Sequence, residues 1–155
     1  MNSWKNMWLD WPMLVLMKTI KPEERIELCP VTANDELYQL GIFEFNITKL
    51  LEYIHANPDR FPLSSISVED FYPEHAVINK RHLKTLSNPD PVILAEISPG
   101  RYDLIDGNHR MQKAKESGVS ALQAYKVPMV DHVRFLTSTK AYTAYVDYWN
   151  GKLAE

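Results

Sequence analysis

Residues 91–127 constrain the fold of this chain more than any other stretch. The bounded apolar run "PVILAEIS" has the length of a buried strand. Pro99-Gly100 follows it as a turn, and "RYDLID" continues as a second extended segment. The segments at 91–98 and 101–106 are therefore predicted to be the two strands of a hairpin.

A helix and a further strand are predicted after the hairpin. Gly107 marks a second turn, and a helix is expected at about 108–117, with Gly118 placed to cap its carboxyl end. "ALQAYKV" at 121–127 then returns as a strand. The predicted order over this stretch is strand, strand, helix, strand.

Outside this stretch, apolar spacing predicts further elements. A helix is expected at 47–56, because apolar residues recur on one face, Asn46 stands at the N-cap position, and two prolines follow in "NPDRFP". The other expected elements are strands at 13–20 and 24–31, a weakly alternating segment at 64–71, a short helix at 78–86, and a terminal amphipathic helix on the pattern Val133, Leu136, Tyr142, Tyr145, Val146 and Trp149.

Composition narrows the class of protein. With 155 residues, 45% of them apolar and 11% aromatic, the chain is expected to form a single packed domain over 1–155. Its formal charge of −3 provides no broad basic field for non-specific nucleic-acid binding. Cys29 is the only cysteine, which suits a reducing compartment, so a cytoplasmic protein is expected. The apolar run at 11–17 is too short to span a bilayer, so no membrane association is expected.

The turn "DGNHR" at 106–110 carries more polar chemistry than a turn needs. Gly107 tolerates backbone angles that side chains forbid, and it lets another group approach the main chain. The helix that follows presents unpaired N–H groups and the positive end of its dipole, which attract an anion. Arg110 could add a bidentate fork for phosphate, and His109 a hydrogen bond or a titratable proton. A phosphate site is therefore predicted at this turn.

Alternatives stay open at the same turn. Asp106 could hold Mg²⁺, orient His109, or fix the turn by bonding to the backbone. The segment could also be an ordinary turn followed by a helix cap, with His109 and Arg110 solvated. No P-loop and no GxGxxG fingerprint occurs elsewhere, so a bound nucleotide would have to use residues 106–110.

The hairpin, the Gly-x-His-Arg turn, the helix ending at glycine and the returning strand resemble the core of the ParB/sulfiredoxin-like superfamily. The segment at 66–86 is similar to the part that precedes this core, so the resemblance covers about 62–127. It implies an α+β fold, a small mixed sheet with flanking helices. Residues 1–61 would be an N-terminal extension, and 128–155 would form a C-terminal helix.

The resemblance also implies a nucleotide at the turn, bound by Gly107, Asn108, His109 and Arg110. Sulfiredoxins, however, carry a reactive cysteine where this chain has Asn108, and a carboxamide cannot act as a thiolate nucleophile. Chromosome-segregation ParB proteins add a helix-turn-helix domain, whereas only one helix is predicted after Val127. Neither of these two activities is expected.

The free-serine kinases of the superfamily are similar at the turn and carry a Glu beside a His in the preceding segment, as "YPEH" does here. This resemblance implies that Glu74 accepts a proton from an attacking hydroxyl, with His75 or His109 as its neighbour. Glu precedes His in this chain, so which of the two faces the site stays open. Glu74 could equally be a surface residue of a proline-containing loop. The catalytic candidates are Glu74, His109 and Asp106.

Two functions follow from the resemblance. In the first, the protein binds ATP, ADP or CTP with Mg²⁺ and transfers or hydrolyses a phosphoryl group, as a kinase, NTPase or nuclease acting on a small-molecule acceptor or a nucleic acid. In the second, the nucleotide pocket is a non-catalytic sensor. A protein partner would then contact the terminal helix or the aromatic N-terminal segment with Trp4, Trp8 and Trp11.

Overall fold

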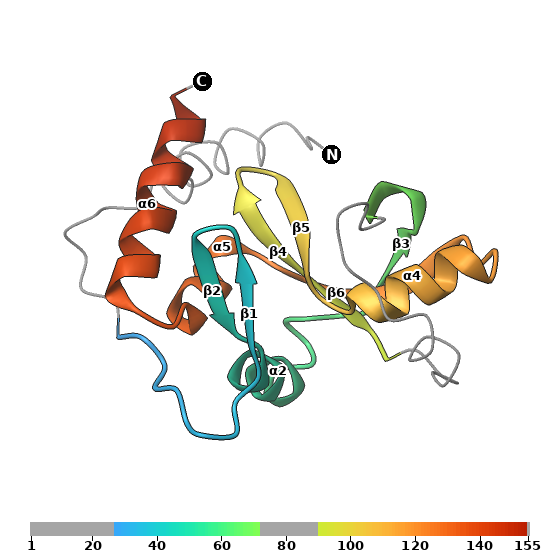
Figure 1. Ribbon diagram of the computed structural model, residues 1–155, viewed down its shortest axis with the longest axis horizontal. Helices are drawn as coiled ribbons and strands as arrows, with labels where there is room; N and C mark the ends of the chain where they lie inside the picture. The colour runs from blue at the N-terminus through green and yellow to red at the C-terminus, as the bar shows by residue number, and fades with distance from the viewer. Residues whose placement is uncertain (1–26, 72–89, 155) are drawn as a thin grey trace, which may run out of the picture.

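The computed structural model describes residues 27–71 and 90–154 of the chain (Figure 1). Its fold is α+β, with a small mixed sheet and flanking helices. The elements are, in order, β1 (Leu37–Leu40), β2 (Phe43–Asn46), α2 (Ile47–Ala56), β3 (Ser64–Ser67), η1 (Glu69–Phe71), β4 (Val92–Ser98), β5 (Arg101–Asp106), α4 (Asn108–Glu116), β6 (Ala121–Val127), α5 (Met129–His132), η2 (Val133–Phe135) and α6 (Thr139–Leu153).

Four strands form the main sheet in the order β3-β6-β4-β5. β4 and β5 pair antiparallel, with Leu94 opposite Leu104, so the predicted hairpin is confirmed. β6 returns beside β4 in the parallel direction, because the chain crosses over through β5 and α4. β3 closes the other edge antiparallel to β6. This topology places the turn after β5 at an edge of the sheet, where α4 begins.

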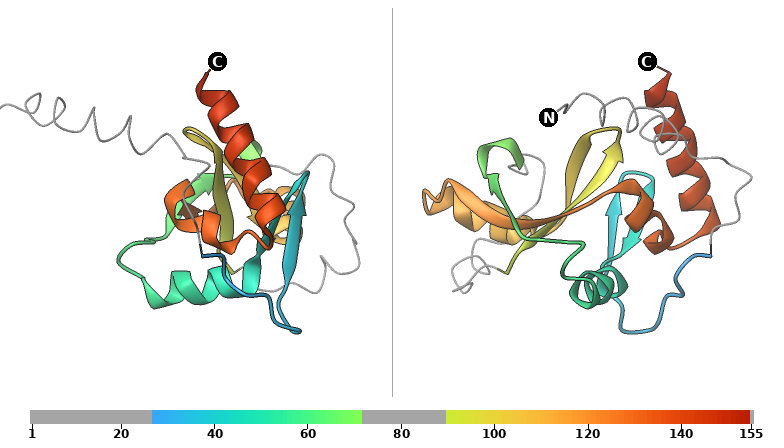
Figure 2. Two further views of the ribbon diagram at one scale, coloured as in Figure 1. Left: turned by 90° about the vertical axis from the view of Figure 1, so that its left-hand side faces the viewer. Right: turned by 180° about the vertical axis from the view of Figure 1, so that it is seen from behind.

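The sheet separates two cores, and β4 is buried on both faces. Val92 and Leu94 face one core, which α4 covers with Met111. Ile93 faces the other core, and side chains of α2, α5 and α6 fill it. Burial on both faces explains why the strand reads as a continuous apolar run in the sequence rather than as an alternating one. Figure 2 shows α4 and α6 lying apart, on either side of the sheet.

A second sheet, the β1–β2 hairpin, was not predicted. Phe43 and Phe45 on β2 are buried in the same core as Tyr145 of α6. The described part of the predicted N-terminal extension therefore shares its core with the C-terminal helix. A glycine between two runs of aromatic and aliphatic residues, in "LYQLGIFEFN", was the sequence signal for this hairpin.

Other boundaries differ from the predictions in part. α4 and β6 confirm the helix and strand expected at about 108–117 and at 121–127. The terminal helix, α6, begins only at Thr139. Val133, which was expected in this helix, lies in η2, and Leu136 lies in the segment between η2 and α6. The strand expected at 24–31 is wrong where it is described, since 27–31 forms no strand. The segments at 13–20 and 78–86 lie outside the described residues.

The start of α2 depends on a buried cap. Asn46 is fully buried, accepts a hydrogen bond from Lys49 N at 3.1 Å, and donates to Asp35 Oδ2 at 2.9 Å. Removing it deletes the predicted N-cap and a second buried bond together.

Replacement of Asn46 by alanine is expected to lower the free energy of unfolding by about 2 kcal/mol. Ser138→Ala is the matched control, because Ser138 caps α6 through Ala141 N at 3.1 Å but lies exposed. This change should cost about 1 kcal/mol. Urea denaturation of both variants measures the difference, and equal losses would show that the buried bond of Asn46 adds nothing.

A buried polar cluster joins α5 and α6 to β4. Nε2 of His132 lies 2.6 Å from the carbonyl oxygen of Glu96, and the hydroxyl of Tyr145 donates to the same oxygen at 2.6 Å. Because a carbonyl only accepts, His132 carries its proton on Nε2. Its buried Nδ1 has no hydrogen-bond partner within residues 27–71 and 90–154. Burial lowers the pKa of His132 to about 4 and raises the pKa of Tyr145.

Among the described helices, none has the length and apolar character needed to cross a membrane.

Candidate functional site

The turn at residues 106–110 joins the last residue of β5 to the first turn of α4. Gly107 is the N-cap of α4, with φ of 106°, and offers no side chain to accept a bond from the helix. A Cβ at this position would overlap Cγ1 of Val92 and lie 2.9 Å from its Cβ. The backbone angle and the neighbouring core side chain of Val92 thus both require a glycine here, and the approach of a ligand to its main chain stays a prediction.

Arg110 is held beside the helix start by an ion pair. Its Nη2 lies 2.9 Å from Oδ2 of Asp106 and 3.5 Å from the carbonyl oxygen of Pro91. The arginine side chain is 21% exposed and the aspartate 17%, so both are partly shielded from water. Nε of Arg110 is buried and has no hydrogen-bond partner among the residues that the structure describes. The guanidinium is therefore fixed in place while part of its donor set stays uncommitted.

Asp106 has a role that was not among the three alternatives considered for it. Its carboxylate pairs with Arg110, which places both on one side of the turn. Asp106 ends β5 and Arg110 lies in the first turn of α4, so the Gly107 turn between them brings the two side chains together.

Asn108 connects the turn to the β1–β2 hairpin. Its Nδ2 donates to the hydroxyl of Tyr38 on β1 at 3.2 Å. Tyr38 lies outside the segment that carries the family resemblance, and sequence reasoning missed it. His109 follows in the first turn of α4 and is partly buried. The structure thus brings Asp106, Gly107, Asn108 and Arg110 together, with Tyr38 as an additional neighbour.

Several predicted groups cannot be placed. Glu74, His75 and the N-terminal tryptophans lie outside the described residues. Within the part of the chain that is described, no three His, Cys, Asp or Glu side chains gather where they could hold a metal ion. The carboxylate of Asp106 is paired with Arg110, and the Mg²⁺ site considered for it stays a prediction.

Two pockets of the described structure lie away from the turn. One, of about 530 Å³, runs along the start of β5 beside Phe71, and the other, of about 490 Å³, lies beside α2. Neither is lined by residues 106–110.

The chain matches no protein-family model and no curated protein. The superfamily resemblance therefore stays a prediction.

Proposed function

We propose that this protein binds a nucleotide, with its phosphates at the amino end of α4. The observation that carries the proposal is the glycine-capped start of α4 with Arg110 beside it. A helix that begins without a side-chain cap directs backbone N–H groups and the positive end of its dipole outward. The arginine adds a positive charge at the same place.

The order of the elements supports a ParB/sulfiredoxin-like fold as part of the same proposal. The hairpin β4–β5 leads into the Gly107 turn, α4 follows, and β6 returns beside β4. This is the arrangement that the resemblance implies for residues 91–127. The remaining proposal, phosphoryl transfer or hydrolysis with Glu74 as base, rests on the resemblance alone.

Substitution of Asn108 by aspartate gives the sharpest test of phosphate binding. A carboxylate in the first turn repels phosphate but interacts favourably with the helix dipole, and it can still accept a bond from Tyr38. Nucleotide affinity should fall at least about tenfold, while the thermal midpoint of the free protein stays equal or rises. Arg110→Lys, which keeps the charge but loses the planar fork, should weaken binding less.

The measurement is calorimetric and thermal-shift titration with ATP, ADP, CTP and GTP, with Mg²⁺ and with EDTA. A ligand that binds the folded state raises the apparent stability by about 3 kcal/mol at one hundred times its Kd. Arg101→Lys is the control, because Arg101 is 69% exposed on β5 and outside the turn. Absence of stabilisation by any nucleotide at millimolar concentration, or equal stabilisation of the Asn108→Asp variant, contradicts the proposal.

Turnover is tested separately, with the nucleotide that binds. Glu74→Gln should retain binding and lose hydrolysis or transfer if the catalytic proposal holds. Nucleotide binding without turnover in the wild-type protein would instead support the second hypothesis, a non-catalytic nucleotide sensor.

A further inference from the structure

The pocket beside α2 is built from three separate segments. Leu28 in the extended segment before β1, Tyr53 on α2 and Phe135 in η2 contribute apolar surface to its lining, and its volume is about 490 Å³. The extended segment is fixed by a backbone bond from Cys29 N to the carbonyl oxygen of Arg134, at 2.8 Å. The side chains of Lys49 and Arg134 line the same pocket.

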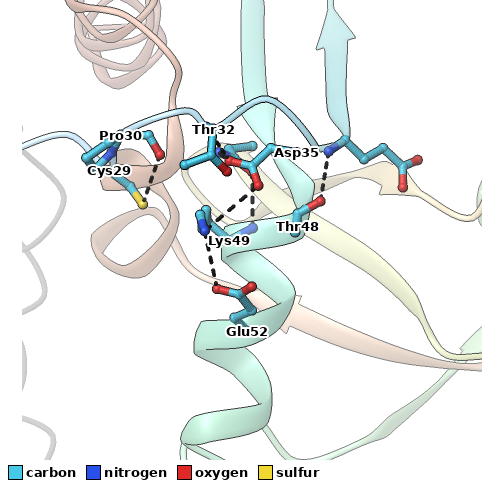
Figure 3. A network of polar contacts seen from close by, with 9 residues as sticks. Cys29, Pro30, Thr32, Asp35, Thr48, Lys49 and Glu52 are labelled. Atoms are coloured by element: carbon cyan, nitrogen blue, oxygen red, sulfur yellow. Dashed lines mark hydrogen bonds and ion pairs between the residues drawn. The ribbon is translucent and has the colours of Figure 1, made fainter.

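Lys49 is positioned by a buried carboxylate. Its Nζ lies 3.9 Å from Oδ1 of Asp35 and 3.8 Å from Oε2 of Glu52, as Figure 3 shows. The side chain of Asp35 is 3% exposed, and it accepts bonds from Thr32 N and Asn46 Nδ2. The backbone bond from Thr32, followed by that from Asn46, lowers the pKa of Asp35. Both ion pairs of Lys49 are longer than a hydrogen bond, so its three donors have no protein acceptor among the described residues.

Arg134 is positioned by an aromatic ring. Its guanidinium carbon lies 5.1 Å from the ring centroid of Tyr53, which itself packs against Phe61 and Phe135. This stacking orients the plane of the guanidinium and leaves the donors at its edge uncommitted. In the described part of the chain, the Arg134 side chain makes no ion pair.

We propose that this pocket binds a small organic anion with one carboxylate and an apolar body. Arg134 and Lys49 donate to the carboxylate, and the surface of Leu28, Tyr53 and Phe135 contacts the body. Glu27 and Glu52 also line the pocket. Together with Asp35, which pairs with Lys49, they outnumber the two cations, so a polyphosphate is repelled more strongly than an anion of single charge. The site is separate from the turn at 106–110 and does not depend on nucleotide binding there.

Cys29 lines the pocket and is the only cysteine of the chain, so it reports whether the pocket is occupied. The experiment measures the rate of Cys29 alkylation by iodoacetamide in the full chain. Phenylacetate at saturation should slow alkylation several-fold. Acetate, which lacks the apolar body, and benzyl alcohol, which lacks the charge, should protect much less at the same concentration.

Arg134→Gln should raise the phenylacetate concentration needed for half-protection about tenfold, through loss of a charge-assisted hydrogen bond. Its thermal midpoint should fall only slightly, because the exposed side chain loses just its stacking on Tyr53 and the bond to Cys29 N uses only its backbone. Arg101→Gln is the control and should leave protection intact. Equal protection in the Arg134→Gln variant, no protection by phenylacetate, or stronger protection by ATP than by phenylacetate would overturn the proposal.

Discussion

Replacement of Gly107 by alanine is expected to lower the free energy of unfolding by about 3 kcal/mol or more. Two costs combine at this position. The backbone has φ of 106°, which a residue with a side chain adopts only under strain. The added Cβ would also overlap Val92 and approach Nη2 of Arg110 to 3.1 Å. Val92 is fully buried on β4, so the sheet and α4 must shift to relieve the overlap.

Gly100→Ala separates these two costs. Gly100 has φ of 76°, but a Cβ there would meet no atom within 4 Å. This control should therefore lose only about 1 kcal/mol, from backbone strain. Urea denaturation of both variants at neutral pH gives the comparison. Similar losses of unfolding free energy in the two variants would show that Val92 moves aside at little cost. Contact with Val92 would then not be the reason for a glycine at position 107.

The second large effect is a loss of stability in mild acid that is centred on His132. Burial lowers the pKa of this histidine to about 4 from its ordinary value of 6.5. Between these two values the unfolded chain binds a proton that the folded protein does not bind. Stability is therefore complete above about pH 6.5 and falls as the pH drops toward 4, by about 3 kcal/mol in all.

His132→Gln tests the assignment, because an amide keeps a donor for the Glu96 carbonyl and does not titrate in this range. Its stability should change much less between pH 7 and about 4.5 than that of the wild type. All side chains other than residue 132 are the same in both proteins, so the comparison isolates the contribution of His132. Urea midpoints at a series of pH values supply the data, and parallel curves for the two proteins would refute the role of His132.

Local sequence signals predicted β4, β5, α4 and β6 well, since each of these elements is bounded by its own turn. Pro99-Gly100 separates the hairpin strands, and Gly107 marks the start of α4. At the candidate site, the need for glycine and the presence of Arg110 beside the helix terminus followed from the sequence. The pairing of Arg110 with Asp106 was not predicted.

The contacts of Tyr38, His132 and Arg134 had no local signal, because each depends on residues distant in the chain. Tyr38 meets Asn108 only because the β1–β2 hairpin packs beside β5. His132 is buried because α6 and β4 enclose it, and its ring contacts Tyr145 and Phe45.

Turn chemistry and apolar periodicity thus determine where the strands and helices of residues 91–127 begin and end, because glycine, proline and helix caps act within a few residues. The same local rules placed the glycine-capped start of α4. Which side chains surround it, and where the pocket of Arg134 forms, were decided by packing across the sheet. Burial and long-range contacts set the environment of each polar group, and no window of sequence contains them.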